Sequence, residues 1–363
     1  MWRRRFVIGL GATGVLTLFG KRSVLASATA SRPIRVRLFS GYDLRSAVIG
    51  GVHVDASSAP TVVSEPTDPI DVAATMSDSS VVERHYSGRI LSAAVDGALV
   101  IYNDVDVESY IASVMASEIS PGWQAEALKA QAIAIRTYGL RRMHHARAAS
   151  YDVTDDTTNQ VYHGVDSIVD SLRAATAATT GQIVSAGGAP ADVWYHSACG
   201  GHTASSSEIT GQPAPRYLQG YPDSDSGGHA FCSASPYYSW RNSLPSSALA
   251  SVAGVGALSS ISIAQRWPDG RVKTVHVVSG GGDSRDIDGH HFYSRATAVL
   301  GYKVVPSSFF DIVPANGGYV LSGHGVGHGV GMCQWGAQGR ARAAQDAATI
   351  LAAYFPGTTI ADS

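Results

Sequence analysis

The sequence predicts an α+β fold in which a helical hairpin packs against antiparallel β-hairpins, preceded by a β-rich N-terminal segment. Two stretches with apolar residues at three- and four-residue spacing flank a polar break at 120–122, which predicts the helical hairpin. Three later pairs of short apolar segments flank turn residues, as strands of β-hairpins do. Because strands and helices do not alternate regularly, a doubly wound parallel sheet is not expected.

The composition excludes one class of partner. The chain has 363 residues, of which 45% are hydrophobic, so it can form a sizeable core. Its net charge is −2, and its one run of basic residues ends at position 5. A protein that binds a phosphate backbone needs a basic surface, so we expect no nucleic-acid partner.

Residues 1–28 are typical of a cleavable export signal. Three arginines at 3–5 precede an apolar stretch at 6–19, and small residues follow at 26–28. The paired arginines also resemble a twin-arginine signal. No later segment has 18 uninterrupted apolar residues, so we expect an exported protein in the periplasm, the cell envelope or the extracellular space.

Residues 29–97 form the predicted β-rich lead-in. Alternating apolar residues at 34–38 and 52–54 predict short strands. The stretch 56–71 is rich in serine, proline and aspartate and predicts a loop.

The helical hairpin follows a strand predicted at 97–104. Asp106 has the side chain of a helix N-cap, so a helix is expected from Val107. Its apolar stripe ends at Glu118, and a second helix is expected at about 124–143. The hairpin thus carries a carboxyl group at the end of an apolar face.

The rest of the chain predicts further helices and hairpins. Asp166 is expected to cap a helix that ends at Gly181. The remaining predictions are hairpins at 182–185 with 192–196, 262–267 with 271–278 and 309–313 with 319–322, and helices at about 290–300 and 336–354.

Glu118 is the first candidate for chemistry. A carboxylate on an apolar face loses hydration, so its pKa rises and it can donate a proton near neutral pH. The alternative is a helix-end residue that reaches solvent or pairs with Arg136 or Lys129. Spacing alone favours this alternative, since most glutamates are unperturbed.

A glycine-rich segment at 323–336 is the second candidate. Its glycines allow the backbone to approach a ligand closely, and it lacks the Lys-Ser/Thr ending of a phosphate loop. Glycine at every second position argues against a helical metal site for its histidines, so a polar substrate wall is the preferred interpretation. Cys333 close to His328 is also a possible nucleophile and base, although closeness in sequence does not establish geometry.

The three cysteines allow two interpretations. In an oxidising compartment, a disulfide between Cys199 and Cys232 leaves Cys333 free. Alternatively, Cys199 and Cys232 hold zinc together with one or two of His196, His202 and His229. The spacing matches no compact zinc motif, so we expect no metal or other cofactor.

Four blocks, in order along the chain, resemble the SpoIID/LytB family. They are Tyr110–Tyr138, which contains Glu118, then Asp152–Tyr162, Tyr195–Thr203 and Gly327–Ala337. The resemblance spans about residues 98–345, which we take as the catalytic domain, and leaves 346–363 as a C-terminal helix and tail. Two departures are Pro121, displaced by one position, and the stretch 154–159, where some members carry His and Cys metal ligands that are absent here.

The resemblance implies a peptidoglycan lytic transglycosylase with Glu118 as catalytic acid and then base. If the sugar's own C6 hydroxyl attacks the anomeric carbon, a 1,6-anhydro-muramyl end forms and one carboxyl group suffices. Polar and aromatic side chains of the blocks and of the glycine-rich segment are predicted to line the groove: Lys129, Gln131, Arg136, Tyr138, Gln160, Tyr162, His196, His324, His328, Gln334 and Trp335.

The LytB branch of the family implies an alternative of another class. In that case the protein is a non-catalytic glycan-binding module that enhances an amidase. The predicted partners are therefore peptidoglycan glycan strands and a cell-wall amidase or other envelope protein. A role in sporulation does not follow from the resemblance.

Overall fold

The computed structural model describes residues 32–58, 60–145 and 150–363, and Pro33–Ser363 form one compact unit. The predicted export signal at 1–28 lies outside the described residues. In the part of the chain that is described, no helix is both long enough and apolar enough to cross a membrane.

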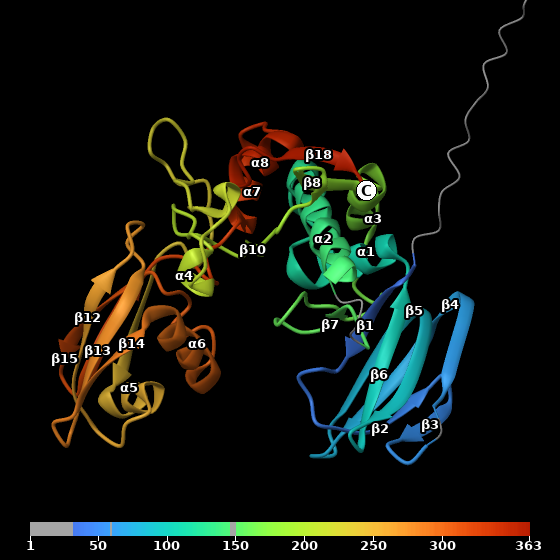
Figure 1. The fold of residues 1–363 in the computed structure, drawn as a ribbon, viewed down its shortest axis with the longest axis horizontal. Helices are drawn as coiled ribbons and strands as arrows, with labels where there is room; N and C mark the ends of the chain where they lie inside the picture. The colour runs from blue at the N-terminus through green and yellow to red at the C-terminus, as the bar shows by residue number, and fades with distance from the viewer. Residues whose placement is uncertain (1–31, 59, 146–149) are drawn as a thin grey trace, which may run out of the picture. The chain divides into compact units, whose positions relative to one another are not determined.

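A twisted sheet of seven strands begins this unit (Figure 1). Its strand order is β3-β2-β4-β5-β6-β1-β7, antiparallel throughout except for the parallel pair β1 and β7. The strands are β1 (Ile34–Leu38), β2 (Leu44–Ile49), β3 (Val52–Asp55), β4 (Val62–Met76), β5 (Val81–Val95), β6 (Ala98–Val105) and β7 (Val153–Thr154).

The strands predicted at 34–38 and 52–54 are confirmed, but the loop predicted at 56–71 is wrong. Most of that stretch belongs to β4, which pairs with β2 on one side and β5 on the other. The pairing with β5 shifts register between Glu65 and Ile70, in the proline-containing part of the strand. Neighbouring strands therefore impose extended structure on a sequence whose local composition favours a loop.

Three helices pack with this sheet in one core: α1 (Val107–Glu118), α2 (Ala125–His145) and α3 (Asp170–Ala178). The predicted cap is confirmed, because the Asp106 side chain accepts a hydrogen bond from the Ser109 amide. Ile34 of β1 and Tyr110 of α1 are among the fully buried members of the core. The domain boundary expected at residue 98 thus falls inside the β5–β6 hairpin, and the lead-in shares a core with the helices.

The cap predicted at Asp166 is wrong. Its carboxylate accepts from His85, 2.6 Å from the Nδ1 atom, and α3 begins only after Val169. The side chain is therefore used in a contact between distant segments.

A second core contains two small sheets and two further helices, which pack against α2. One sheet has the order β18-β8-β9, and the other pairs β10 with β17 in parallel. The elements are β8 (Gln182–Ala186), β9 (Ala189–Pro190), β10 (Tyr195–His196), β17 (Met332–Cys333), α7 (Gln334–Arg342), α8 (Ala347–Tyr354) and β18 (Thr359–Asp362).

Two predictions in this core need correction. The hairpin partner predicted at 192–196 is wrong, because β8 pairs with β9, while Tyr195 and His196 pair with β17. The single helix expected at 336–354 is two helices, separated at Ala344, which has a φ of 62°. The expected tail contains a strand, because β18 pairs with β8.

A third core holds two three-stranded sheets, with orders β11-β16-β15 and β12-β13-β14. The hairpins predicted at 262–278 and 309–322 and the helix predicted at 290–300 are confirmed here. The elements are β11 (Trp240–Pro245), α5 (Ser246–Ala253), β12 (Leu258–Arg266), β13 (Val272–Ser279), β14 (Ser284–Asp288), α6 (Gly289–Leu300), β15 (Phe310–Ala315) and β16 (Gly318–Gly323). Two short helices precede them, α4 (Ser207–Thr210) and the 3-10 turn η1 (Arg216–Leu218).

Candidate active site

Glu118 is the last residue of α1, and its side chain is half-buried. Its Oε1 atom accepts a hydrogen bond of 3.0 Å from the backbone amide of Val161. Neither cation considered from the sequence is its partner, because Lys129 pairs with Glu126 and Arg136 with Glu108. The carboxyl group is therefore positioned by a backbone donor and not by a salt bridge.

Burial raises the pKa of Glu118, because the carboxylate loses hydration, and the Val161 amide lowers it in part. The position at a helix C-terminus acts in the same direction as burial, since the helix dipole disfavours a negative charge there. No charged side chain in the described part of the chain contributes to the shift. Glu118 consequently holds a proton to a higher pH than an ordinary glutamate does.

Gln160 fixes the segment that reaches Glu118. Its side chain is buried, accepts from the Tyr110 hydroxyl at 2.7 Å and donates to the Tyr195 hydroxyl at 2.9 Å. The preceding residue, Asn159, donates to the Tyr138 hydroxyl at 2.8 Å. These bonds hold the 159–161 backbone against α1 and α2, so the Val161 amide points at the carboxyl group.

Tyr195 connects Glu118 to the glycine-rich segment. The pKa of Tyr195 lies well above its ordinary value, first because of burial and next because of the negative charge of Glu118. The Tyr195 carbonyl accepts from His328 Nε2 at 2.9 Å, while His328 Nδ1 accepts from the Val330 amide at 3.1 Å. The Nε2–H tautomer is the one that satisfies both bonds.

His328 is therefore held neutral. Burial lowers its pKa to about 4, and the Tyr195 carbonyl raises it only in part. A neutral imidazole in this place supports the Tyr195 backbone.

Glycines allow the segment to lie against β10. Gly331 has a φ of 71°, and a Cβ there would collide with the Trp194 carbonyl. Gly327 has a φ of 101°, and a Cβ there would lie 3.1 Å from the Cβ of His196. The expected close approach of this backbone is thus made to the protein's own β10 strand.

Two residues of the predicted groove are structural instead. Arg136 is 1% exposed and forms two hydrogen bonds with the Glu108 carboxylate, at 2.8 and 2.6 Å. Tyr162 is fully buried, donates to Asn103 and stacks on Tyr110. Their burial prevents contact with a glycan strand, because the packing around them excludes even water.

Three more predicted groove residues are buried: Gln131, His196 and Gln334. His196 Nδ1 donates to the Val330 carbonyl at 3.0 Å, which leaves its Nε2 without a partner in the described structure. The Nε2 atoms of both glutamines are likewise buried without a partner there. These side chains support the walls of the site and do not form its surface.

The remaining predicted groove residues keep some exposure. Lys129 and Tyr138 are half-buried on α2, and Trp335 packs edge-on against Trp123 with ring centroids 5.2 Å apart. His324 is exposed, with its Nδ1 atom 3.0 Å from the Tyr238 carbonyl. Their roles in binding glycan stay predictions.

The structure contradicts the predicted disulfide and the predicted Cys333 nucleophile. Cys199 and Cys232 lie side by side as free thiols, with their sulfurs 3.6 Å apart, so the predicted disulfide is not formed. Cys333 is not separate from them, because the pairing of β10 with β17 brings it into the same buried cluster. A Cys333 nucleophile is contradicted by its complete burial and by the two other contacts of the His328 ring.

The histidines proposed as zinc ligands lie elsewhere. His202 Nδ1 contacts the Thr203 carbonyl at 2.7 Å, and the exposed His229 lies beside Asp225. The fourth ligating group of the cysteine cluster is Asp223, which no spacing rule indicated.

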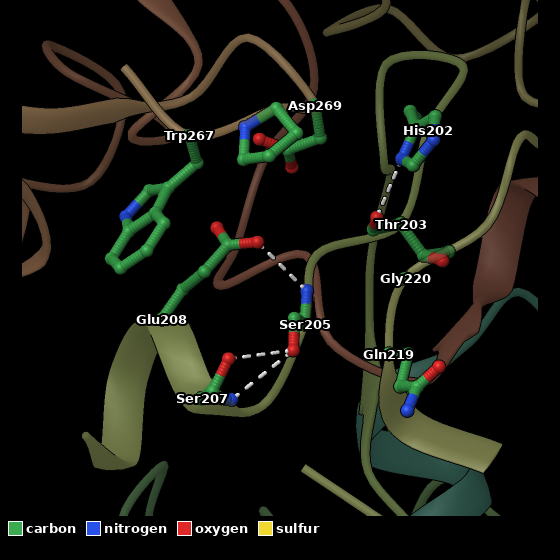
Figure 2. A pocket seen from close by; sticks show the side chains of 10 residues that line it. His202, Thr203, Ser205, Ser207, Glu208, Gln219, Gly220, Trp267 and Asp269 are labelled. Carbon is green, nitrogen blue, oxygen red and sulfur yellow. Dashed lines mark hydrogen bonds between the residues drawn. The ribbon is translucent and has the colours of Figure 1, made fainter. Parts of the chain in front are cut away.

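A pocket of about 370 Å³ was not anticipated from the sequence. Figure 2 shows the Glu208 carboxyl group of α4 facing the side of the pocket that holds Trp267 and Asp269. Glu208 accepts from the Ser205 amide at 2.9 Å. Burial, followed by the negative charge of Asp269, raises its pKa to about 7. The only sequence signal here was the hairpin predicted at 262–267 with 271–278, whose first strand ends at Trp267 and whose turn contains Asp269.

The fold and the site define a mixed α/β protein with a half-buried carboxyl group at the end of α1, and known proteins resemble it. A family model described as stage II sporulation protein (SpoIID) matches residues 95–185, which include Glu118 and its Val161 donor. An uncharacterised protein of Brachyspira hyodysenteriae is 32% identical over 76% of this chain and 72% of its own length. The chain belongs to the SpoIID/LytB family.

Two further relatives have descriptive names. The amidase enhancer of Bacillus subtilis is 26% identical over 68% of this chain, which spans only 39% of that relative. The stage II sporulation protein D of Bacillus amyloliquefaciens is 25% identical over 72% of this chain and 75% of its own length.

Proposed function

We propose that this protein is a peptidoglycan lytic transglycosylase that cleaves glycan strands and leaves 1,6-anhydro-muramyl ends. The observation that carries the proposal is a single half-buried carboxyl group, Glu118, whose pKa is raised by burial and whose position is fixed by the Val161 amide. Family membership supports a substrate in the cell wall.

The isolation of Glu118 favours this reaction over hydrolysis. Glycoside hydrolases flank the bond with two carboxyl groups about 5 to 9.5 Å apart. A second carboxylate so close would raise the Glu118 pKa further through like-charge repulsion, and none in the described structure contributes to the shift. A mechanism that needs one carboxyl group therefore fits this site better.

The proposed step balances without water. Glu118 gives its proton to the glycosidic oxygen as the bond to the anomeric carbon breaks. The C6 hydroxyl of the same sugar then bonds to that carbon, and the Glu118 carboxylate takes the hydroxyl proton. The acid is regenerated, and the product is an internal anhydride.

The Val161 amide serves the second half of this cycle. It donates to the carboxylate that exists only after the first proton transfer, and a hydrogen bond to an ionised acceptor is stronger than one to a neutral group. The fixed amide thereby stabilises charge where it develops, without reorientation.

The proposed place of action is outside the cytoplasm, at the glycan strands of the wall. The export pattern at 1–28 supports this, and no metal or organic cofactor is needed for the proposed proton transfers.

Purified sacculi and peptide-free glycan provide the test. Mass spectrometry of the soluble products should show anhydro-muramyl ends with the wild type and a loss of about 10²- to 10⁴-fold with Glu118→Gln. Glu83→Gln is the matched control, since Glu83 is an exposed glutamate on β5. Full cleavage by Glu118→Gln, or reducing ends without the anhydro product, would refute the proposal.

A second candidate is a non-catalytic amidase-enhancing module, favoured by the similarity to an amidase enhancer. In that case the purified protein releases no anhydro ends, and Glu118→Gln stimulates a cell-wall amidase as well as the wild type does. Measuring both activities on the same sacculi separates the two functions.

A further inference from the structure

Three cysteines and an aspartate from distant parts of the chain meet in one buried cluster. Cys199, Asp223, Cys232 and Cys333 each place a ligating atom within 4.8 Å of the other three. The cysteines are completely buried, and Asp223 is 1% exposed. We propose that this cluster, which we call the Cys3Asp cluster, binds a structural zinc ion.

The distances fit a tetrahedral ion. Zinc bonds of about 2.3 Å to sulfur and about 2.0 Å to oxygen give edges of roughly 3.8 Å between sulfurs and roughly 3.5 Å from sulfur to oxygen. The Cys199 sulfur lies 3.6 Å from the Cys232 sulfur and 3.3 Å from Asp223 Oδ2. Four donors fill a structural zinc site completely, whereas a single disulfide leaves the third thiol and the carboxylate unexplained.

Backbone amides are arranged to support thiolates. The Gly201 amide donates to the Cys199 sulfur at 3.3 Å, and the Cys199 amide donates to the Cys333 sulfur at 3.2 Å. Cys333 is also the N-cap of α7 and accepts from the Gly336 amide at 3.2 Å. A helix N-terminus and amide donors favour the thiolate, which is the form that ligates a metal.

The carboxylate ligand is oriented by two further side chains. Arg340 of α7 donates twice to Asp223 Oδ1, at 3.1 and 3.0 Å, and the Tyr354 hydroxyl of α8 lies 2.9 Å from Oδ2. Ligating carboxylates usually have such hydrogen-bonded support. Arg340 also offsets part of the negative charge that three thiolates and a carboxylate leave around a divalent ion.

A glycine at the start of α7 leaves space for the Asp223 carboxylate. A Cβ at Gly336 would collide with both the Tyr354 hydroxyl and Asp223 Oδ2. Only glycine at the start of α7 lets the aspartate reach the thiols.

The zinc ion joins three segments of the second core. It connects the chain after β10, the 223–232 loop and β17, and β10 also carries Tyr195 of the Glu118 site. On binding, each ligating thiol releases its proton to solvent, so affinity falls as the pH falls.

Metal content of the reduced full-length chain tests the proposal. Elemental mass spectrometry should find one zinc per chain, and cobalt substitution should give thiolate charge-transfer bands with the visible bands of a tetrahedral ion. Cys232→Ser and Cys333→Ser should each lose metal during gel filtration. The exposed His229→Asn is the control, because His229 lies outside the cluster and should leave metal content unchanged.

Tyr354→Phe keeps the test valid if the cysteine variants do not fold. It retains all four ligands and removes one supporting hydroxyl, so zinc affinity in a chelator competition should fall about 10-fold. A wild-type chain without zinc that gives no cobalt–thiolate spectrum would overturn the proposal. So would a Cys199–Cys232 disulfide in the intact mass, or unchanged metal binding in both cysteine variants.

Discussion

Glu118 and Glu208 are two glutamates with raised pKa values in contrasting surroundings. Among the described residues, no charged neighbour shifts the pKa of Glu118, which accepts one hydrogen bond from a backbone amide at a helix end. Glu208 lies in a pocket of about 370 Å³, where the charge of Asp269 adds to burial while Arg271 opposes it. A cavity and a perturbed acid thus occur together at Glu208, whereas the family match covers Glu118.

A raised pKa alone does not identify the catalytic acid, since both glutamates have one. At Glu208 the neighbouring Asp269 pairs with the buried Arg271, so its charge is a permanent part of the packing. At Glu118 the Val161 amide is positioned to stabilise a carboxylate formed during a reaction.

The largest expected difference is in glycan cleavage. Glu208→Gln should release anhydro ends within about 3-fold of the wild-type rate, against the loss of about 10²- to 10⁴-fold expected for Glu118→Gln. Time courses on peptide-free glycan, quantified by mass spectrometry, give both rates. If Glu208→Gln is the inactive variant, the pocket is the catalytic site.

The next expected difference is in stability, between Gln160 near Glu118 and Gln219 in the Glu208 pocket. Gln160→Ala removes the partner of the Tyr110 and Tyr195 hydroxyls, so the free energy of unfolding should fall by about 2 to 4 kcal/mol. Gln219 lines the pocket but is exposed, so Gln219→Ala should change the free energy of unfolding by no more than about 0.5 kcal/mol. Urea unfolding followed by tryptophan fluorescence measures both, and equal effects would contradict the network at Gln160.

The pH profile of cleavage sharpens the assignment further. A general acid works in its protonated form, so kcat/KM should fall about tenfold per pH unit above the pKa of that acid. For Glu118 this descent begins above the ordinary glutamate value of about 4.3 and is unchanged by Glu208→Gln. A descent centred near pH 7 that disappears in Glu208→Gln would assign the acid to Glu208.

The smallest expected effect is the pH dependence of stability at Glu208. Its pKa is about 7 in the folded chain and 4.5 in the reference state, so the folded form binds more protons between these values. Wild-type stability therefore falls as the pH rises through this window. The difference in free energy of unfolding between Glu208→Gln and the wild type should therefore shift by about 1 to 2 kcal/mol in favour of the variant from pH 4.5 to 7. This value allows for solvent screening of a half-buried group. Thermal melts of both proteins at matched ionic strength test this, and parallel curves would contradict it.

Sequence reasoning succeeded where the signal is local. The cap at Asp106, the apolar stripe that ends at Glu118 and the hairpins at 262–278 and 309–322 all appear in the structure. It failed at 56–71, where pairing with β2 and β5 overrides local composition, and at Asp166, which contacts His85 instead of capping a helix.

At the candidate site, too, the local feature was predictable and the contacts between distant segments were not. Glu118 was identified from its place on a stripe, but its Val161 donor lies 43 residues away in the sequence. Its electrostatic effect on the pKa of Tyr195 involves a third segment. Arg136 and Tyr162 were misassigned because both side chains are buried and bonded within the protein, to Glu108 and Asn103, which the pattern does not reveal.

Local spacing was enough to place the start of α1 at Asp106, the hairpins at 262–278 and 309–322, and the carboxyl group of Glu118 at the end of an apolar face. Those features depend on interactions among residues a few positions apart. In contrast, the contact of Cys333 with Cys199 across 134 residues, and the place of Asp223 beside them with Arg340 as its partner, could not be read from spacing. The reason is that such contacts depend on how whole strands and helices pack, which no local spacing specifies.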